Sequence, residues 1–321
     1  MDPDYCRRCF EENLRPIAED YFGARLIDPD NFPLAEVGRR PIIVVANHSG
    51  MGLSWDNIIL DFLLYDLMRA QVGAQQAIAQ KAVRLVDPLF ISHVTVAPFG
   101  LRGWWSRIGC VAATSANFEQ AMAARRIVIV SPEGVAGISK GAGRRYRLQR
   151  FSSSFLRMAH AHGALVVPVS VVNGEYLNPL NVSWSWLNRI GRWFGFPFVP
   201  VGTGMLQALI PAAYLNPRPA RLTYVVHEPV DFDVDPLRSH DQLTAEAETF
   251  RQAHQIRLDA AVKTYDLPRA QTAKPGRSPF FWHEMFLKTA GDSAWLAILY
   301  KIPLGYPLIW LARRIARRRP T

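Results

Sequence analysis

Short apolar runs recur along residues 40–230 and alternate with longer segments whose apolar positions have helical spacing. Four runs are rich in β-branched residues and bounded by turn residues: 42–46, 127–130, 165–172 and 222–227. Short runs that are apolar throughout are typical of strands buried on both faces of a sheet. Their alternation with helices predicts an α/β fold, with a mostly parallel central sheet flanked by helices.

Apolar residues at helical spacing predict helices at 5–22, 57–69, 115–124, 148–162 and 245–264. Residues 71–94 mix short apolar runs with charges, and we interpret them as a strand followed by a helix. We expect one α/β domain over residues 1–272, with an N-terminal helical element at 1–38. A C-terminal extension over residues 273–321 is expected to associate with a membrane.

The C-terminal extension carries the strongest membrane signal. Residues 295–312 are mostly apolar but are interrupted by Lys301 and by prolines, and five arginines follow between Arg313 and Arg319. A spanning helix needs ~20 apolar residues, so an in-plane or re-entrant anchor fits better, with its arginines on anionic lipid. A terminal helix docked on the domain is the alternative.

Two further stretches have two readings each. Trp104 and Trp105 lie between Arg102 and Arg107, a mixture that suits a membrane interface, although the tryptophans fit a protein core equally well. Residues 193–215 contain no charged residue but several prolines and glycines. They are too broken to span a membrane and predict either the apolar wall of a lipid site or a buried loop.

The chain has 321 residues, is 49% hydrophobic and carries a formal charge of +10, which favours an anionic partner. The basic residues cluster at 144–150 and at the C-terminus, each beside apolar stretches, so we expect an anionic membrane surface rather than nucleic acid. Cys6 and Cys9 form a C-x-x-C without a second Cys/His pair. We therefore predict reduced cysteines on an N-terminal helix and no metal.

His48 directly follows the apolar run 42–46, and Asp56 stands at the start of the helix predicted for 57–69, where an N-cap acceptor belongs. In open α/β sheets, sites are built at the carboxyl ends of the strands. A carboxylate on one imidazole nitrogen fixes the tautomer, and the other nitrogen can then take a proton from a hydroxyl. Seven intervening residues make contact between the two side chains possible without ensuring it.

A second candidate loop, residues 131–141, follows the predicted strand 127–130. Its glycines, Ser139 and Lys140 can hold a phosphate through backbone N–H groups and an ammonium, with Arg144 close behind. Residues 137–141 also match G-x-S-x-G, the pattern of a serine-hydrolase elbow. An elbow needs a strand directly before the serine and a helix directly after it, so this esterase reading is the weaker one.

Taken in order, these motifs resemble the glycerolipid (lysophosphatidate-type) acyltransferase family over residues 40–230. The resemblance is closest to the diacylglycerol-acyltransferase-like subgroup, which has a long Asn-His-Ser-Gly…Trp-Asp loop. It is carried by Asn47-His48-Ser49-Gly50, Trp55-Asp56, Pro132-Glu133-Gly134 and residues 145–151, 167–169 and 173–175.

The resemblance implies a membrane-bound α/β domain that transfers an acyl chain from acyl-CoA or acyl carrier protein to a lipid hydroxyl, with no other cofactor. It makes His48 the general base and Asp56 the residue that orients it, and it places Glu133 and Gly134 by the acceptor. We add Asn47, Ser49 and Gly50 to the substrate-binding candidates, and expect amides of the loop 49–53 to stabilise the oxyanion. The N-terminus lacks an apolar signal-peptide region, so we expect peripheral or monotopic attachment to the cytoplasmic face.

Two departures from the family pattern concern the acceptor site. Seven residues separate His48 from Asp56, where the family has four, and the usual Glu-Gly-Thr-Arg-Ser is replaced by residues 133–137 without an arginine. Lys140 or Arg144 is the expected replacement for that arginine, or the acceptor lacks a phosphomonoester. A catalytically silent lipid-binding protein on the same fold is the alternative from another functional class.

Overall fold

A computed structural model was used to describe the fold. It describes residues 1–50, 53–88, 91, 103–178, 180–193, 198–199, 201, 209–210, 217–267, 298–299 and 301–316.

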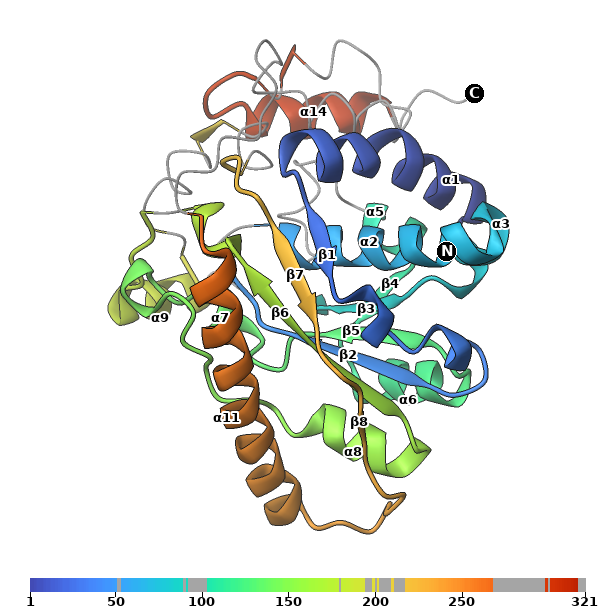
Figure 1. Ribbon diagram of the computed structural model, residues 1–321. Coiled ribbons are helices and arrows are strands. Elements are labelled where there is room, and N and C mark those ends of the chain that lie inside the picture. The colour runs from blue at the N-terminus through green and yellow to red at the C-terminus, as the bar shows by residue number, and fades with distance from the viewer. Residues whose placement is uncertain are drawn as a thin grey trace.

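An eight-stranded sheet forms the centre of the molecule, in the order β1-β7-β6-β2-β5-β3-β4, with β8 paired to β6 (Figure 1). The strands are β1 (Arg25–Ile27), β2 (Ile42–Ala46), β3 (Val83–Val86), β4 (Cys110–Ala112), β5 (Ile127–Val130), β6 (Leu165–Val172), β7 (Thr223–Val226) and β8 (Val230–Asp231). Strands β6, β2, β5, β3 and β4 are parallel neighbours, whereas β7 and β8 pair with β6 antiparallel. The predicted α/β fold with a mostly parallel sheet is confirmed.

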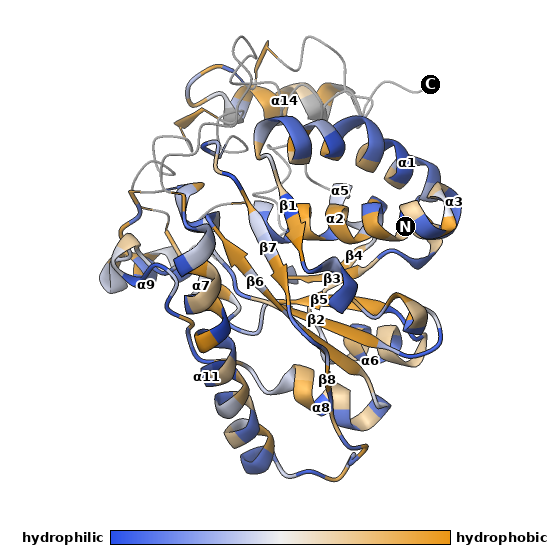
Figure 2. Ribbon diagram, viewed as in Figure 1, coloured by the Kyte–Doolittle hydropathy of each residue, from blue (hydrophilic) through white to orange (hydrophobic). Residues whose placement is uncertain are grey.

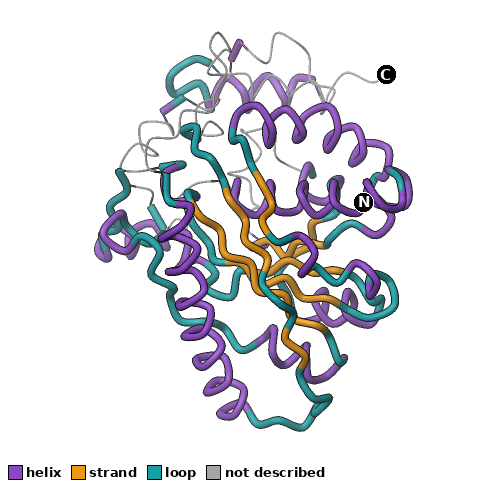
Figure 3. Tube along the Cα trace, in the orientation of Figure 1, coloured by secondary structure: helices purple, strands orange, loops and turns teal. Residues whose placement is uncertain are grey.

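Helices cover both faces of this sheet (Figures 1 and 3). They are α1 (Pro3–Arg8), the π-helical η1 (Cys9–Leu14) and η2 (Ile17–Tyr21), α2 (Trp55–Val72), α3 (Ala74–Gln80), α5 (Trp104–Arg107), α6 (Ser115–Ala123), α7 (Val135–Ile138), α8 (Ser154–His162), α9 (Ser185–Trp193), α11 (His240–Tyr265) and α14 (Tyr306–Ala316). Short 3₁₀ turns lie at Pro29–Asn31, Leu34–Glu36, Ala142–Arg144 and Gly174–Tyr176.

The central strand β2 divides two hydrophobic layers. Ile42, Val44 and Ala46 pack into the layer that contains residues of α1, α2, α3 and α5. Ile43 and Val45 pack into the layer formed with α6, α8 and α11. All five residues are fully buried, as a strand covered on both faces requires, and Figure 2 shows the central strands as predominantly hydrophobic.

Two secondary-structure predictions are wrong. The helix α3 precedes the strand β3, so the prediction that a strand comes first in residues 71–94 is wrong. Gly73, with φ of +79°, ends α2, and helix-forming Ala and Gln residues follow it before the β-branched 83–86 run. The predicted helix 148–162 begins only at Ser154, because the amides of Leu148 and Gln149 donate to the side chains of Gln255 and Glu133.

The paired tryptophans belong to the core. Trp104 is 3% exposed and Trp105 is 2% exposed, and their ring centroids lie 4.8 Å apart. The Arg84 guanidinium lies over the Trp105 ring at 5.4 Å. Of the two readings of this stretch, the structure therefore supports the core reading, while the neighbouring Arg102 lies outside the described residues.

Cys6 and Cys9 lie on the N-terminal helical segment, buried and free, as does Cys110 on β4. Burial raises the pKa of both the Cys6 and the Cys9 thiol to about 12. Among the described residues, no helix combines the length and the apolar character needed to cross a bilayer.

A buried histidine makes the stability of the fold depend on pH. His254 of α11 is fully buried, and neither ring nitrogen has a hydrogen-bond partner among the described residues. Burial, with the nearby His227 and Arg257 adding to it, lowers the pKa of His254 to about 3. Since the unfolded chain binds this proton near pH 6.5, we expect the free energy of unfolding to fall by roughly 2 kcal/mol between pH 7 and pH 5 through this residue.

Urea denaturation of wild type and of His254→Phe at pH 7 and pH 5 measures this contribution. The variant should lose less stability than wild type on acidification, by about the same 2 kcal/mol. An identical pH dependence of the two proteins would show that His254 does not carry the effect.

Candidate active site

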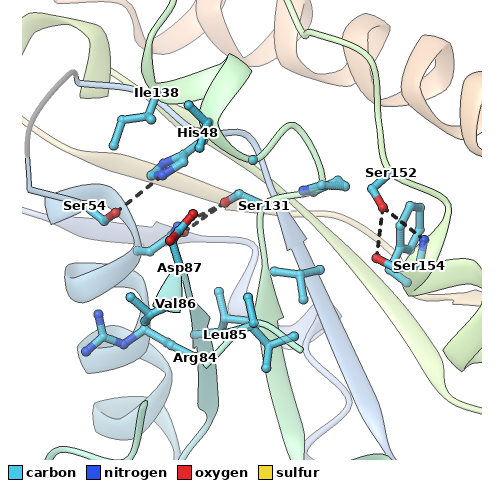
Figure 4. A pocket seen from close by; sticks show the side chains of 18 of the residues that line it. His48, Ser54, Arg84, Leu85, Val86, Asp87, Ser131, Ile138, Ser152 and Ser154 are labelled. Atoms are coloured by element: carbon cyan, nitrogen blue, oxygen red, sulfur yellow. Dashed lines mark hydrogen bonds between the residues drawn. The ribbon is translucent and has the colours of Figure 1, made fainter. Parts of the chain in front are cut away.

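Loops that follow three neighbouring parallel strands meet at one edge of the sheet. His48 follows β2, Glu133 follows β5, and Gly174 and Glu175 follow β6. Parallel strands bring their carboxyl ends to the same edge, which is where α/β proteins build their sites. Figure 4 shows His48 in this region, above the cavity described below.

The two residues predicted to form an acid–base pair are in contact. His48 Nδ1 lies 2.7 Å from Asp56 Oδ2. The same oxygen accepts the Ser49 N–H at 2.8 Å, and Asp56 Oδ1 accepts the Asn57 N–H at 2.8 Å. Each carboxylate oxygen of Asp56 is therefore fixed by a backbone N–H group. The two side chains are in contact despite the seven residues between them.

The prediction that Asp56 caps its helix is wrong. Helix α2 begins at Trp55 with Ser54 as its N-cap residue, so Asp56 lies within the first turn. Its carboxylate turns back toward His48, and its main-chain carbonyl accepts the Tyr224 hydroxyl at 2.8 Å. Asp56 is thereby anchored by β7 as well as by its own helix.

The charge of Asp56 governs the titration of His48. Burial by itself would lower the pKa of His48. The Asp56 carboxylate outweighs burial through its charge and its hydrogen bond, with a smaller contribution from Glu133, so the pKa lies above its ordinary value. With Nδ1 committed to Asp56, Nε2 is the nitrogen that can take a proton.

His48 lines a cavity of about 260 Å³, together with Ser54 (Figure 4). The Ser54 hydroxyl lies 3.4 Å from Nε2. The walls are mostly apolar and come from several elements, including Val86 of β3, Ile138 of α7 and Phe155 of α8. An apolar chamber with a basic nitrogen at its edge suits a substrate with a long apolar part and one reacting polar group.

Glu133 fixes the backbone of His48. Its Oε1 accepts the His48 N–H at 3.0 Å, and its Oε2 accepts the Gln149 N–H at 2.7 Å. The side chain is fully buried, with both oxygens engaged by protein amides. Glu133 thus positions the histidine, while Gly134, next to it, is exposed and lines the cavity.

Lys140 is a structural cation in this arrangement. It is 6% exposed, and its Nζ lies 3.1 Å from Glu175 Oε1 and 3.8 Å from Glu133 Oε2. Burial raises the pKa of Glu175, and the Lys140 ammonium acts against that rise. A buried ammonium between two carboxylates does not offer its charge to a phosphate, so the predicted anion-binding role does not fit Lys140, whereas Arg144 is exposed.

Close backbone contacts hold the loops together. A Cβ on Gly174 would meet Ser49 Oγ at 2.1 Å, and a Cβ on Gly50, whose φ is +77°, would meet the Gly174 carbonyl oxygen at 2.8 Å. A Cβ on Gly137 would lie 3.1 Å from His48 Cβ. Glycine is therefore required where the loops after β2, β5 and β6 touch.

Asn47 and Ser49 serve the fold of the loop. The Asn47 side chain clamps Val171 of β6, donating to its carbonyl oxygen at 3.0 Å and accepting its N–H at 2.7 Å. Because the Ser49 N–H is bonded to Asp56, it is not free for the oxyanion role expected of this loop. Residues 51 and 52 of the same loop lie outside the described part of the chain.

Ser139 lacks the setting of a hydrolase nucleophile. It follows the short helix α7, not a strand, since β5 ends at Val130. His48 Nε2 instead faces the hydroxyl of Ser54. The G-x-S-x-G match at residues 137–141 therefore does not form a nucleophile elbow.

Several polar residues at the cavity were not predicted from the sequence. Besides Ser54, Asn57 Nδ2 donates to Ser131 Oγ at 3.0 Å, which links α2 to the loop after β5. Small polar residues flanking Asp56 and opening the 131–141 loop are the only sequence signal for them. Of the stretch 193–215, most residues lie outside the described part, but Phe198 lines the cavity.

The chain is similar to several known proteins. Uncharacterized proteins of Mycobacterium leprae and Mycobacterium tuberculosis are 28% and 26% identical over 231 residues, or 72% of this chain. The chain spans 57% and 58% of the length of these relatives. The 1-acyl-sn-glycerophosphate acyltransferase PlsC of Thermotoga maritima aligns with a TM-score of 0.43 at 17% identity, with 80% of each chain covered. The Acyltransferase family model matches residues 23–172, which contain β2, β5, β6 and His48, so this part of the chain is similar to that family.

Proposed function

We propose that this chain is a membrane-associated O-acyltransferase. It moves an acyl chain from acyl-CoA or acyl carrier protein to a hydroxyl of a lysophospholipid or related glycerolipid. The observation that carries the proposal is the 2.7 Å contact between His48 Nδ1 and Asp56 Oδ2 at the rim of an apolar cavity. The acyltransferase family match over residues 23–172 supports the same class of reaction.

In the proposed reaction, His48 Nε2 takes the proton of the acceptor hydroxyl as its oxygen attacks the thioester carbonyl. The C–S bond then breaks, and the departing thiolate takes the proton from the imidazolium. Asp56 stabilises the imidazolium that forms between these steps and keeps Nε2 directed at the substrate. Ser54 Oγ, at 3.4 Å from Nε2, lies in the direction from which the acceptor hydroxyl would approach.

We place the acyl chain in the cavity of about 260 Å³ beneath His48. Its walls come from the sheet, from α7 and α8 and from Phe198. An apolar chain gains free energy by leaving water for such a chamber. Of residues 193–215, the expected acyl-chain wall, Phe198 is the described residue that contributes to it.

We propose that the chain attaches to the cytoplasmic face of a membrane, and helix α14 supports a surface anchor. Ile309 is fully buried and Ala312 is 7% exposed, so one side of this helix is docked on protein. Leu308, Leu311 and Ile315 share another side and are about half exposed. A helix docked on one side and apolar on the other fits the in-plane anchor expected for this extension.

An acyl-transfer assay with the full chain tests the proposal. Radiolabelled acyl-CoA and acyl carrier protein are offered with a panel of lysophospholipids and with diacylglycerol, and the lipid products are separated. Labelled product that increases with enzyme concentration is the expected result. If the folded protein binds the lipids and transfers no label with any pair, the silent lipid-binding alternative replaces the proposed activity.

A further inference from the structure

Helix α9 and the residues before it present an apolar face to solvent. Trp193 is 81% exposed and Trp186 is 58% exposed. The other large exposed apolar side chains of residues 180–193 are Leu180, Val182, Trp184 and Ile190. Folded monomers rarely expose so many large apolar side chains together unless the surface binds something.

The two charged residues of α9 are both arginines. Arg189 and Arg192 are exposed on α9 beside the tryptophans. From residue 176 to residue 227 the sequence contains no aspartate or glutamate. Tryptophan, aliphatic residues and arginine without acidic neighbours are the composition of helices that lie in the interface of an anionic bilayer.

The face is attached directly to the proposed active site. The Ala142 N–H donates to the Asn181 carbonyl at 2.8 Å, which joins the segment before α9 to the loop that carries Lys140. After the helix, the Val199 N–H donates to Asn188 Oδ1 at 2.9 Å, and the adjacent Phe198 lines the His48 cavity with Ile138. Figure 1 shows α9 at the periphery of the molecule.

We infer that the face formed by residues 180–193 docks on an anionic lipid bilayer, with α9 lying in the plane of the interface. Trp186 and Trp193 enter the headgroup region, while Arg189 and Arg192 meet lipid phosphates. Docking in this way brings the cavity of His48 to the lipid surface. The inference adds a second lipid-binding face to the one proposed for α14, and it rests on the proposed function only in taking lipid as the substrate.

A second copy of the chain is a poorer occupant of this face. A symmetric dimer through α9 would bring Arg189 and Arg192 of the two copies together. No acidic residue of the segment 176–227 is present to balance them. An anionic bilayer supplies that balance, and it also accepts the tryptophans.

Vesicle flotation of the full chain tests the inference. Vesicles of phosphatidylcholine with phosphatidylglycerol are compared with vesicles of pure phosphatidylcholine. Trp186→Ser/Trp193→Ser should bind the mixed vesicles at least about tenfold more weakly, since two aromatic side chains no longer enter the interface. Arg189→Gln/Arg192→Gln should lose about fivefold per arginine on mixed vesicles and little on pure phosphatidylcholine.

The matched control removes equally exposed apolar residues elsewhere. Leu237 is 91% exposed and Ile256 is 72% exposed, and Leu237→Ser/Ile256→Ser should bind like wild type. The inference would be overturned if the control and the tryptophan variant lost vesicle binding equally. It would also be overturned if a folded tryptophan variant bound vesicles as wild type does. It would also be overturned if light scattering without lipid showed a dimer that the tryptophan substitutions dissociate while vesicle binding stays unchanged.

Binding and catalysis fail separately in this design. His48→Gln should float with mixed vesicles as wild type does, because His48 lies in the cavity and not on the α9 face. Vesicle binding through α9 by a protein without acyl-transfer activity would contradict the proposed function and leave the docking face intact. If the protein transfers acyl groups but its vesicle binding is unchanged by the α9 substitutions, the docking face is contradicted and the proposed function stands.

Discussion

His48→Gln is expected to lower the rate of acyl transfer by roughly 10²- to 10⁴-fold, the usual contribution of a general base. Glutamine fills a similar space but cannot accept a proton from the acceptor hydroxyl. The contact of the residue 48 N–H with Glu133 involves the main chain and should survive the substitution. We therefore expect the loss in kcat, measured with labelled acyl donor and saturating acceptor, with little change in thermal stability.

Ser139→Ala is the matched control for this experiment. Ser139 lies on the neighbouring loop, half-buried, at the end of α7, and takes no part in the proposed chemistry. It should retain the wild-type rate of acyl transfer. A folded His48→Gln protein with wild-type kcat would refute the general-base role, and loss of activity in Ser139→Ala would return the esterase-type nucleophile to consideration.

Lys140→Met is expected to lower the free energy of unfolding by about 3 kcal/mol, because it leaves buried carboxylates without their cation. Lys140 Nζ lies 3.1 Å from Glu175 and 3.8 Å from Glu133, and its side chain is 1% exposed. Methionine keeps most of the volume, so loss of charge is the main change. Urea denaturation of purified protein at neutral pH measures the difference.

Two comparisons separate this structural role from substrate binding. Arg144→Met removes an exposed cation four residues further along and should leave stability within about 0.5 kcal/mol of wild type. Lys140→Met/Glu175→Gln should regain part of the lost stability, since one unpaired carboxylate is removed with the cation. If Lys140→Met is as stable as wild type and instead raises KM for a phosphorylated acceptor, Lys140 binds substrate and the structural assignment is wrong.

The sheet and the position of His48 could be predicted because strands buried on both faces leave a strong local pattern. Residues 42–46, 127–130 and 165–172 are β-branched, apolar and bounded by turns, and they form β2, β5 and β6 with the predicted bounds. Their parallel pairing places the loops that follow them at one edge. The location of the candidate site therefore follows from local sequence and the general behaviour of parallel sheets.

What could not be predicted depends on contacts between distant residues. Nothing local shows that Lys140 is buried, because its position is fixed by Glu133 and by Glu175 after β6. The start of α8 at Ser154 is displaced because Gln255 and Glu133 take the amides of residues 148 and 149. Long-range partners such as these override helix propensity.

The His48–Asp56 pair could be predicted only in part from the sequence. The residue types and their places at a strand end and a helix start indicated a pair, but the long spacer left their contact open. The spacing works because Asp56 lies inside the first turn of α2 and accepts the Ser49 N–H, which folds the loop back onto its own start. The carboxylate serves both its own helix and the loop, because Oδ1 accepts the Asn57 N–H of α2 while Oδ2 contacts His48 and Ser49.

The rate of acyl transfer as a function of pH, for wild type and for Asp56→Asn, tests the central claim most directly. The base must be neutral to act, so the wild-type rate should fall on acidification through a pKa above the ordinary value of about 6.5, because Asp56 raises the pKa of His48 against the effect of burial. Removing that charge should move the acid limb to lower pH and lower the maximal rate. The account would be contradicted if the folded Asp56→Asn protein kept both the wild-type maximal rate and the wild-type position of the acid limb.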